Sequence, residues 1–187
     1  MAFLMEAERL RTVLRATRIG DGSRRENSAE HSWHLSLFAL VLAEHAPDDI
    51  DLARVLKMLI LHDIVEVDAG DQPLHGGGDK AAQDAAELAA ADRLYGLLPE
   101  DQANELRAIW EEFEAAKTPE AQFAKALDRF QPPMLNLATD GGTWKDYGVT
   151  TMKPIEARVA PAVRQGAPGL WDYLLLRLRD YFAKSDR

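Results

Sequence analysis

Cysteine is absent from this chain of 187 residues. Without cysteine the chain can form no disulfide bond, no metal site built from thiolates and no thiol nucleophile. Any metal ligands must come from histidine and carboxylate side chains, so the five histidines are the residues to follow.

Long apolar runs are also missing, because no stretch reaches about 18 residues without a charge. We therefore expect no membrane span. The chain starts Met-Ala-Phe-Leu-Met-Glu, which lacks the apolar segment of a secretory signal. A cytoplasmic location is the resulting expectation.

Positive charge is scarce, and the formal net charge of −9 argues against a nucleic-acid polymer as partner. Residues 1–30 nevertheless hold six arginines against five acidic residues, a net +1, so the rest of the chain carries −10. Arginine can grip a phosphate with two parallel hydrogen bonds. We take Arg18, followed by Arg24 and Arg25, as candidate phosphate contacts. A solvated helix face with paired charges is the alternative.

Sustained alternation of apolar and polar residues, which would indicate strands, is not seen anywhere. The periodicity is helical throughout, and Asn27 to Glu30 has the pattern of a capping box at a helix start. These patterns predict an all-α fold with one compact domain over residues 1–187. The expected helices cover residues 4–16, 28–45, 51–67, 80–97, 100–116, 119–138, 151–164 and 170–184, with a loop at 68–79.

The run Leu61-His62-Asp63-Ile64-Val65-Glu66 is apolar except at three positions. If the helix continues, His62 and Glu66 are four residues apart and share one face. Burying an imidazole and two carboxylates costs several kcal/mol unless a charge meets them, and a divalent metal is the simplest partner. The alternative is a satisfied core histidine next to solvated acids.

Two histidines on the preceding helix are candidates for a further ligand. His31 lies in the first turn, near the arginine cluster, whereas His34 lies one turn deeper. Either one could ligate, and His34 could equally be a core residue. A third carboxylate, Asp128, flanks the apolar stripe of its helix, and a surface ion pair with Lys125 or Arg129 is the alternative there.

These residues resemble a known pattern. Glu30-His31-Ser32, then His62-Asp63-x-x-Glu66, then Asp128 in the context Lys125-Ala-Leu-Asp are similar to the HD-domain metal-dependent phosphohydrolases, in particular the small branch with the bacterial 5′-deoxynucleotidase. The resemblance covers about residues 5–140. It implies an all-helical HD-domain core there, with the helices of residues 150–184 packed on it.

The resemblance also implies a site and an assembly. One divalent metal would be held by His31, His62, Asp63 and Asp128, with Glu66 as the catalytic acid or base, in a homodimer. Asp71 would edge the pocket and is a candidate contact to the sugar or to a water near the metal. In these enzymes an arginine well before the first histidine helps to hold the phosphate, but here the stretch reads Arg15-Ala-Thr-Arg18, which departs from that pattern.

Two imidazoles and two carboxylates form a mixed nitrogen and oxygen set, which suits Mn²⁺, Co²⁺, Fe²⁺ or Ni²⁺, with Mg²⁺ or Zn²⁺ also open. The expected activity is hydrolysis of a small phosphomonoester, foremost a nucleoside or deoxynucleoside 5′-monophosphate. Trp33 could stack on the base, or belong to the core. A non-catalytic module that binds metal and nucleotide is the second hypothesis, although such a module has no need for Glu66.

Overall fold

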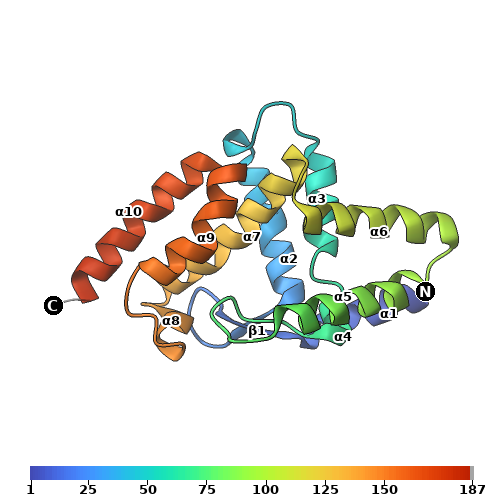
Figure 1. Ribbon diagram of the computed structural model, residues 1–187, viewed down its shortest axis with the longest axis horizontal. Helices are drawn as coiled ribbons and strands as arrows, with labels where there is room; N and C mark the ends of the chain where they lie inside the picture. The colour runs from blue at the N-terminus through green and yellow to red at the C-terminus, as the bar shows by residue number, and fades with distance from the viewer. Residues whose placement is uncertain (186–187) are drawn as a thin grey trace.

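The structure of the protein is a computed structural model, and it describes residues 1–185 (Figure 1). Helices dominate these residues, which confirms the predicted fold class. No helix among them is long and apolar enough to cross a membrane. The elements are α1 (Ala2–Glu8), η1 (Arg9–Thr12), β1 (Leu14–Arg18), β2 (Arg25–Asn27), α2 (Ser28–Val41), η2 (Ala43–His45), α3 (Leu52–Leu61), α4 (Glu66–Ala69), α5 (Lys80–Tyr95), α6 (Glu100–Ala115), α7 (Pro119–Ala138), α8 (Gly142–Asp146), α9 (Lys153–Gly166) and α10 (Pro168–Ser185).

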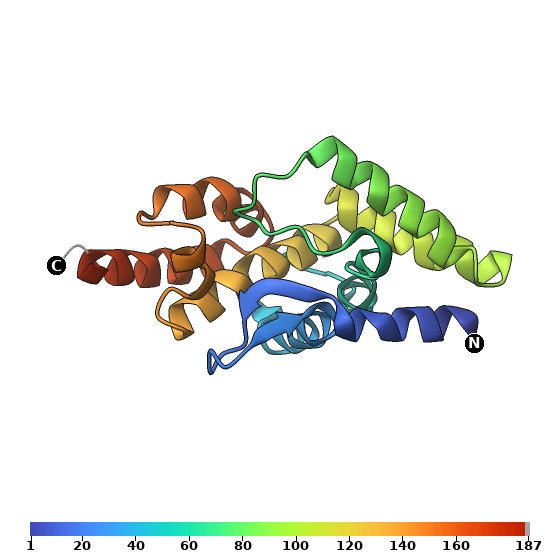
Figure 2. The same cartoon turned by 90° about the horizontal axis from the view of Figure 1, so that it is seen from below.

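Helix α7 is the centre of the fold. It contacts α2, α3, α6, α8, α9 and α10, and it spans Pro119–Ala138, which are the predicted bounds, with Pro132 and Pro133 inside it (Figure 1). Phe123, Ala124, Ala126 and Leu127 of this helix are fully buried, so its middle is surrounded by other helices. Helices α9 and α10 pack on α7, and α1 and α10 lie at opposite ends of the molecule (Figure 2).

The predicted helix over residues 4–16 is wrong in its second half. After α1 and the short η1, the chain extends into β1, which pairs antiparallel with β2. Alternation was invisible in the sequence because the buried side chains of β1 are polar: Thr17 is buried and the Arg15 side chain is only 11% exposed. A strand whose inward side chains are polar carries no apolar period of two.

The start of α2 is as predicted. The Asn27 side chain accepts a hydrogen bond from the Glu30 backbone N–H at 3.0 Å, and the Glu30 carboxylate accepts one from the Asn27 N–H at 3.2 Å. This capping box fixes the first turn of α2 and therefore the position of His31. The helix ends at Val41, followed by η2.

Helix α3 ends six residues earlier than the predicted 51–67. It stops at Leu61, and residues 62–65 form tight turns with hydrogen bonds from Ile64 N–H to Leu61 C=O and from Glu66 N–H to Asp63 C=O. The short α4 then begins at Glu66. His62 and Glu66 are thus joined by a turn instead of a continuous α-helix, which corrects the geometry expected from their spacing.

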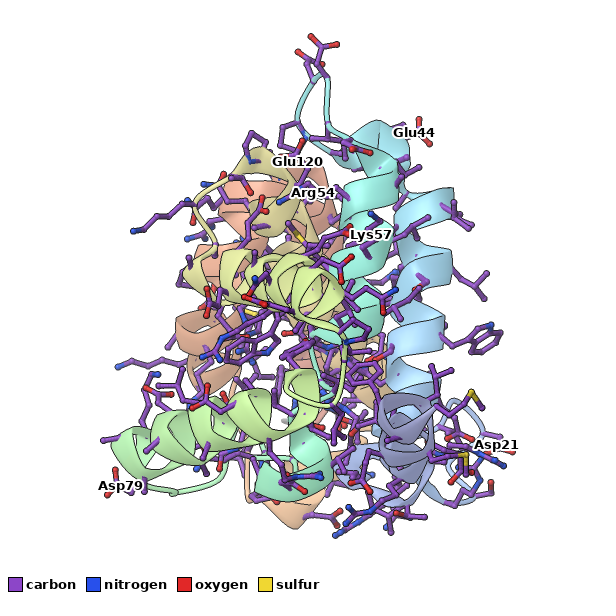
Figure 3. The ribbon with its side chains drawn as sticks, turned by 90° about the vertical axis from the view of Figure 1, so that its right-hand side faces the viewer. Asp21, Glu44, Arg54, Lys57, Asp79 and Glu120 are labelled. Atoms are coloured by element: carbon purple, nitrogen blue, oxygen red, sulfur yellow. The ribbon has the colours of Figure 1, made fainter. Side chains whose placement is uncertain are left out.

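Helix α6 is attached to α3 by charged side chains as well as by packing. Arg54 and Lys57 of α3 face α6, where Arg54 pairs with Glu112 and Lys57 pairs with Glu105 at 3.2 Å (Figure 3). Such partly exposed pairs contribute little stability each. They fix the side of α3 on which α6 lies, and the C-terminal end of α6 thereby reaches the site described next.

Candidate metal centre and catalytic site

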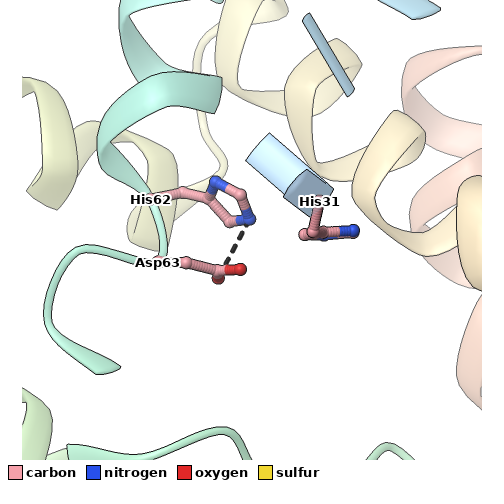
Figure 4. A group of neighbouring side chains, drawn as sticks. All are labelled: His31, His62 and Asp63. Atoms are coloured by element: carbon pink, nitrogen blue, oxygen red, sulfur yellow. Dashed lines mark ion pairs between the residues drawn. The ribbon is translucent and has the colours of Figure 1, made fainter. Parts of the chain in front are cut away.

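Four side chains from three parts of the chain converge at the base of α2. His31 comes from the first turn of α2, and His62 and Asp63 follow α3 (Figure 4). Asp128 lies in the middle of α7. Asp128 Oδ1 lies 3.1 Å from His31 Nε2 and 3.9 Å from His62 Nε2, and Asp63 Oδ1 lies 2.9 Å from His62 Nε2. Ligand atoms of His31, His62 and Asp63 all lie within 4.8 Å of one another.

The hydrogen bonding of these groups fits a bound cation. His62 Nδ1 lies 2.9 Å from the Leu59 carbonyl, which can only accept, so Nδ1 carries the proton and Nε2 has a free lone pair. Yet His62 Nε2 has no hydrogen-bond partner, although Asp63 is adjacent. A buried lone pair next to carboxylate oxygens is unfavourable by itself. His31, His62 and Asp63 could hold a divalent cation, which would satisfy this lone pair.

Both carboxylates are ionised and ready to ligate. Burial raises the pKa of Asp63, but the neighbouring His62 and the charge of Arg15 outweigh it and hold this pKa below its ordinary value. Burial likewise raises the pKa of Asp128, and Arg129 together with the His31 hydrogen bond outweighs it. Two buried anions at one point again favour a cation there.

Arg15 of β1 reaches the same place. Its Nη1 donates a hydrogen bond to Asp63 Oδ2 at 2.8 Å and lies 3.5 Å from Asp71 Oδ1 and 3.9 Å from Glu66 Oε1. A guanidinium so buried and so placed can bind one phosphate next to the metal ligands. Arg15 stands in the stretch that the sequence had flagged, although Arg18 was preferred.

The structure does not bring Arg18, Arg24, Arg25 or Trp33 to this site, since none of them lines the cavity above it. Arg24 instead pairs with Glu30 at 2.6 Å on the surface, and Arg25 is exposed. Both follow the turn of the β1–β2 hairpin, which projects away from the helices (Figure 2). Trp33 is neither core nor site, because 64% of it is exposed on the outer side of α2.

Glu66 and Asp71 do lie at the site. Glu66 Oε2 accepts a hydrogen bond from Ser28 Oγ at 2.6 Å. Burial and the charge of Asp63 raise the pKa of Glu66 to about 9, so this carboxyl holds a proton at neutral pH in the metal-free protein. Burial also raises the pKa of Asp71, in spite of the Arg15 charge.

A cavity of about 420 Å³ opens above these groups. Arg15, His62, Asp63, Glu66 and Asp128 lie on its inner side. Its other walls come from the segment of residues 71–78, from the start of α5 and from the end of α6, with four further cationic side chains, Lys80, Lys125, Arg129 and Arg158. A cavity of this size and polarity suits a small phosphorylated molecule.

Sequence reasoning missed two residues in contact with the site. Ser28 holds Glu66, and Glu26, which is 2% exposed, lies next to His31. Ser28 belongs to the segment that was assigned only to helix capping, and Glu26, two residues before it, was counted only among the five acidic residues of the first 30. The one available signal was an acidic residue in a short segment leading directly into the candidate ligand His31.

Comparison with known proteins adds a family. The family model described as HD domain matches residues 7–171. The 5′-deoxynucleotidase HDDC2 of Homo sapiens is 30% identical over 106 residues, which is 57% of this chain and 50% of the relative. The 5′-deoxynucleotidase hdd1 of Schizosaccharomyces pombe is 29% identical over 134 residues, covering 69% of this chain and 66% of that protein. The chain thus spans about half to two thirds of the length of these curated relatives.

Solved structures agree with the fold. A crystal structure of a predicted metal-dependent phosphohydrolase from Magnetospirillum magnetotacticum MS-1 superposes with a TM-score of 0.92 at 44% identity, covering 100% of this chain and 92% of that one. A conserved hypothetical protein from Pyrococcus furiosus, at a TM-score of 0.54 and 22% identity, shares the fold alone.

Proposed function

The chain belongs to the HD-domain family, and from this premise we propose that it is a metal-dependent phosphohydrolase that acts on a nucleoside or deoxynucleoside 5′-monophosphate. One observation carries the proposal: His62, Asp63, Asp128, the buried Arg15 and Glu66 line the inner side of one cavity, and a ligand atom of the buried His31 lies within 4.8 Å of those of His62 and Asp63. The names of the 5′-deoxynucleotidase relatives and of the phosphohydrolase neighbour support it.

The residues of the chain divide the chemistry among them. His31, His62, Asp63 and Asp128 would hold a divalent cation, which would supply Lewis-acid chemistry at the phosphate and lower the pKa of water. Arg15 binds the phosphate and offsets the charge that builds up on it during transfer. Burial raises the pKa of Glu66, and this carboxyl would donate a proton to the oxygen of the leaving nucleoside.

The nucleoside part fits the outer half of the cavity. Asp71 lies 3.5 Å from Arg15, at the border between the phosphate position and the remaining space, where it can accept a hydrogen bond from a sugar hydroxyl. The ligand set suits Mn²⁺, Co²⁺, Fe²⁺ or Ni²⁺ best. With a net charge of −9, the chain repels long polyanions, so we expect no activity on nucleic-acid polymers.

The experiment that tests this function is phosphate release. Protein loaded with Co²⁺ or Mn²⁺ is offered a panel of ribo- and deoxynucleoside 5′-monophosphates, 3′-monophosphates and single-stranded DNA, with His62→Ala as the inactive control. We expect release from 5′-monophosphates alone. Tight nucleotide binding without any release would favour the second hypothesis, a non-catalytic metal- and nucleotide-binding module. Preferred cleavage of DNA would contradict the proposal.

We further propose that the whole chain works as one domain and pairs with a second copy through the outer face of α2. Between Glu30 and Glu44 the sequence has no Asp, Glu, Lys or Arg, yet Trp33, Leu40 and Val41 are exposed, Val41 to 73%. Two copies of a chain with charge −9 repel each other except where their facing surfaces carry no charge. An apolar groove of about 560 Å³ between α2, α7 and α10 adjoins this face.

Light scattering after size exclusion tests the pairing. We expect a dimer for the wild type and a monomer for Val41→Glu. The matched control is Leu88→Glu, since Leu88 is 50% exposed on α5, away from this face, and this variant should remain dimeric. A monomeric wild type would contradict the pairing. A cytoplasmic location stays a prediction.

A further inference from the structure

Glu26 is a buried carboxylate with one unsatisfied oxygen. Its Oε1 accepts a hydrogen bond from Gln131 Nε2 at 2.8 Å. Its Oε2 has no hydrogen-bond partner and lies 3.4 Å from His31 Nδ1 and 3.8 Å from Arg15 Nε, which lack partners as well. Buried polar groups without hydrogen-bond partners are rare, so three of them facing one another indicate that these groups have a role at the site.

The two nitrogens of His31 have different neighbours. Nε2 lies among the ligand atoms, 3.1 Å from Asp128 Oδ1. For Nε2 to ligate a cation as a neutral imidazole, the proton must lie on Nδ1. The acceptor facing Nδ1 is Glu26 Oε2, and a carboxylate in that position orients a metal-binding imidazole and raises its basicity.

We propose that Glu26 is the positioning residue for the metal centre. Its carboxylate accepts a hydrogen bond from His31 Nδ1–H and thereby directs Nε2 to the cation. The proposal rests on the metal site of the proposed function. Gln131 fixes Glu26 from the other side, and it lies on α7 one turn after Asp128. Helix α7 therefore supplies both a ligand and the anchor for the residue that orients a second ligand. Glu26 Oε2 also lies 3.8 Å from Arg15 Nε, so the same carboxylate helps to orient the arginine that is proposed to bind phosphate.

The variant Glu26→Gln tests this assignment because it changes the direction of one hydrogen bond. Gln131 donates to position 26, so the oxygen of the new amide stays on that side and its NH₂ group faces His31 Nδ1. A donor there moves the imidazole proton to Nε2, the nitrogen that must ligate. We expect the Kd for Co²⁺, measured by titration of its visible absorption, to rise by about 10- to 100-fold.

A matched control shows whether the loss of one negative charge is enough to change the affinity for Co²⁺. Glu44→Gln makes the same change at an exposed site on η2 and should leave the Kd for Co²⁺ unchanged. The double variant Glu26→Gln with Gln131→Glu exchanges the two groups and restores an acceptor toward His31, because the amide at position 26 can then donate to the new carboxylate. We expect this double variant to recover most of the lost affinity.

Three results would overturn the assignment. The first is a single variant Glu26→Gln that binds Co²⁺ as tightly as the wild type, and the second is a double variant that binds no better than the single one. Should Glu26→Gln fail to fold by far-UV circular dichroism, Gln131→Leu leaves the carboxylate in place but untethers it. The Kd of Gln131→Leu for Co²⁺ should rise several-fold. An unchanged Kd for this variant is the third result that would overturn the assignment. A wild type that binds no Co²⁺ would instead refute the metal site itself.

Discussion

Replacement of Glu66 by glutamine would separate proton transfer from metal binding. The amide is isosteric with the carboxyl group and can still accept the hydrogen bond from Ser28 Oγ, which is 2.6 Å long in the wild type. Arg15 remains 2.8 Å from Asp63, so the phosphate position should survive. What the variant loses is the proton that Glu66 holds through its raised pKa of about 9.

The expected magnitude follows from the role. General acid catalysis contributes about 10²- to 10⁴-fold, which corresponds to roughly 3 to 5 kcal/mol of transition-state stabilisation at about 1.4 kcal/mol per decade. We expect kcat to fall within this range while KM changes less than a few-fold, since Glu66 is not assigned to ground-state binding.

The assay is steady-state phosphate release from a deoxynucleoside 5′-monophosphate, with metal content measured on the same samples. Ser28→Ala is the matched comparison: it removes the hydroxyl that orients Glu66 but keeps the proton, so its loss should be smaller. Near-wild-type turnover by Glu66→Gln would refute the reasoning. Loss of the metal from this variant would make Glu66 a ligand and leave the acid unassigned.

Three other predictions concern the same site. Asp128→Ala should lose the bound metal by elemental analysis, and full occupancy would remove Asp128 from the ligand set. Arg15→Met should raise KM and lower the free energy of unfolding in urea by about 3–5 kcal/mol, because it leaves buried carboxylates without their cation; unchanged KM would mean that Arg15 does not bind phosphate. In metal-free protein, Glu66→Gln should melt increasingly above the wild type as the pH rises from about 5 to 9. The folded-state pKa of Glu66 lies above its ordinary 4.5, so the stability it contributes is complete below that value and is lost as the pH approaches 9. Parallel melting curves across this range would contradict the raised pKa.

The helices and the group around His62 could be predicted because their signals are local. The capping box at Asn27, the span of α7 and the apolar run before His62 each depend on residues within a few positions of one another. The fold class followed from the same periodicities. That Asp128 meets His31 could be proposed only from a family resemblance, since 97 residues separate the two in sequence.

The parts that failed are those where polar side chains point inward. Strand β1 has no apolar alternation because its inward side chains include Arg15 and Thr17. Arg18 was preferred over Arg15 because the sequence does not show which of the two side chains is buried. Only the pairing of β1 with β2 shows that Arg15 is the enclosed arginine. Glu26 had no signal beyond its charge, because its burial depends on its contacts with His31 and with Gln131 of α7.

Because the proposed ligands come from distant parts of the sequence, a cation at this site would link these parts and stabilise the folded chain. His31 and Asp128 are 97 residues apart, so one ion would tie α2, the turn after α3 and α7 into closed loops, much as a cross-link does. A covalent link that closes a loop of about 100 residues restricts the unfolded chain by roughly 4–5 kcal/mol. In a protein without cysteine, the metal would then be the reversible counterpart of a disulfide, and chelation should speed the local opening of these three segments and their cleavage by proteases.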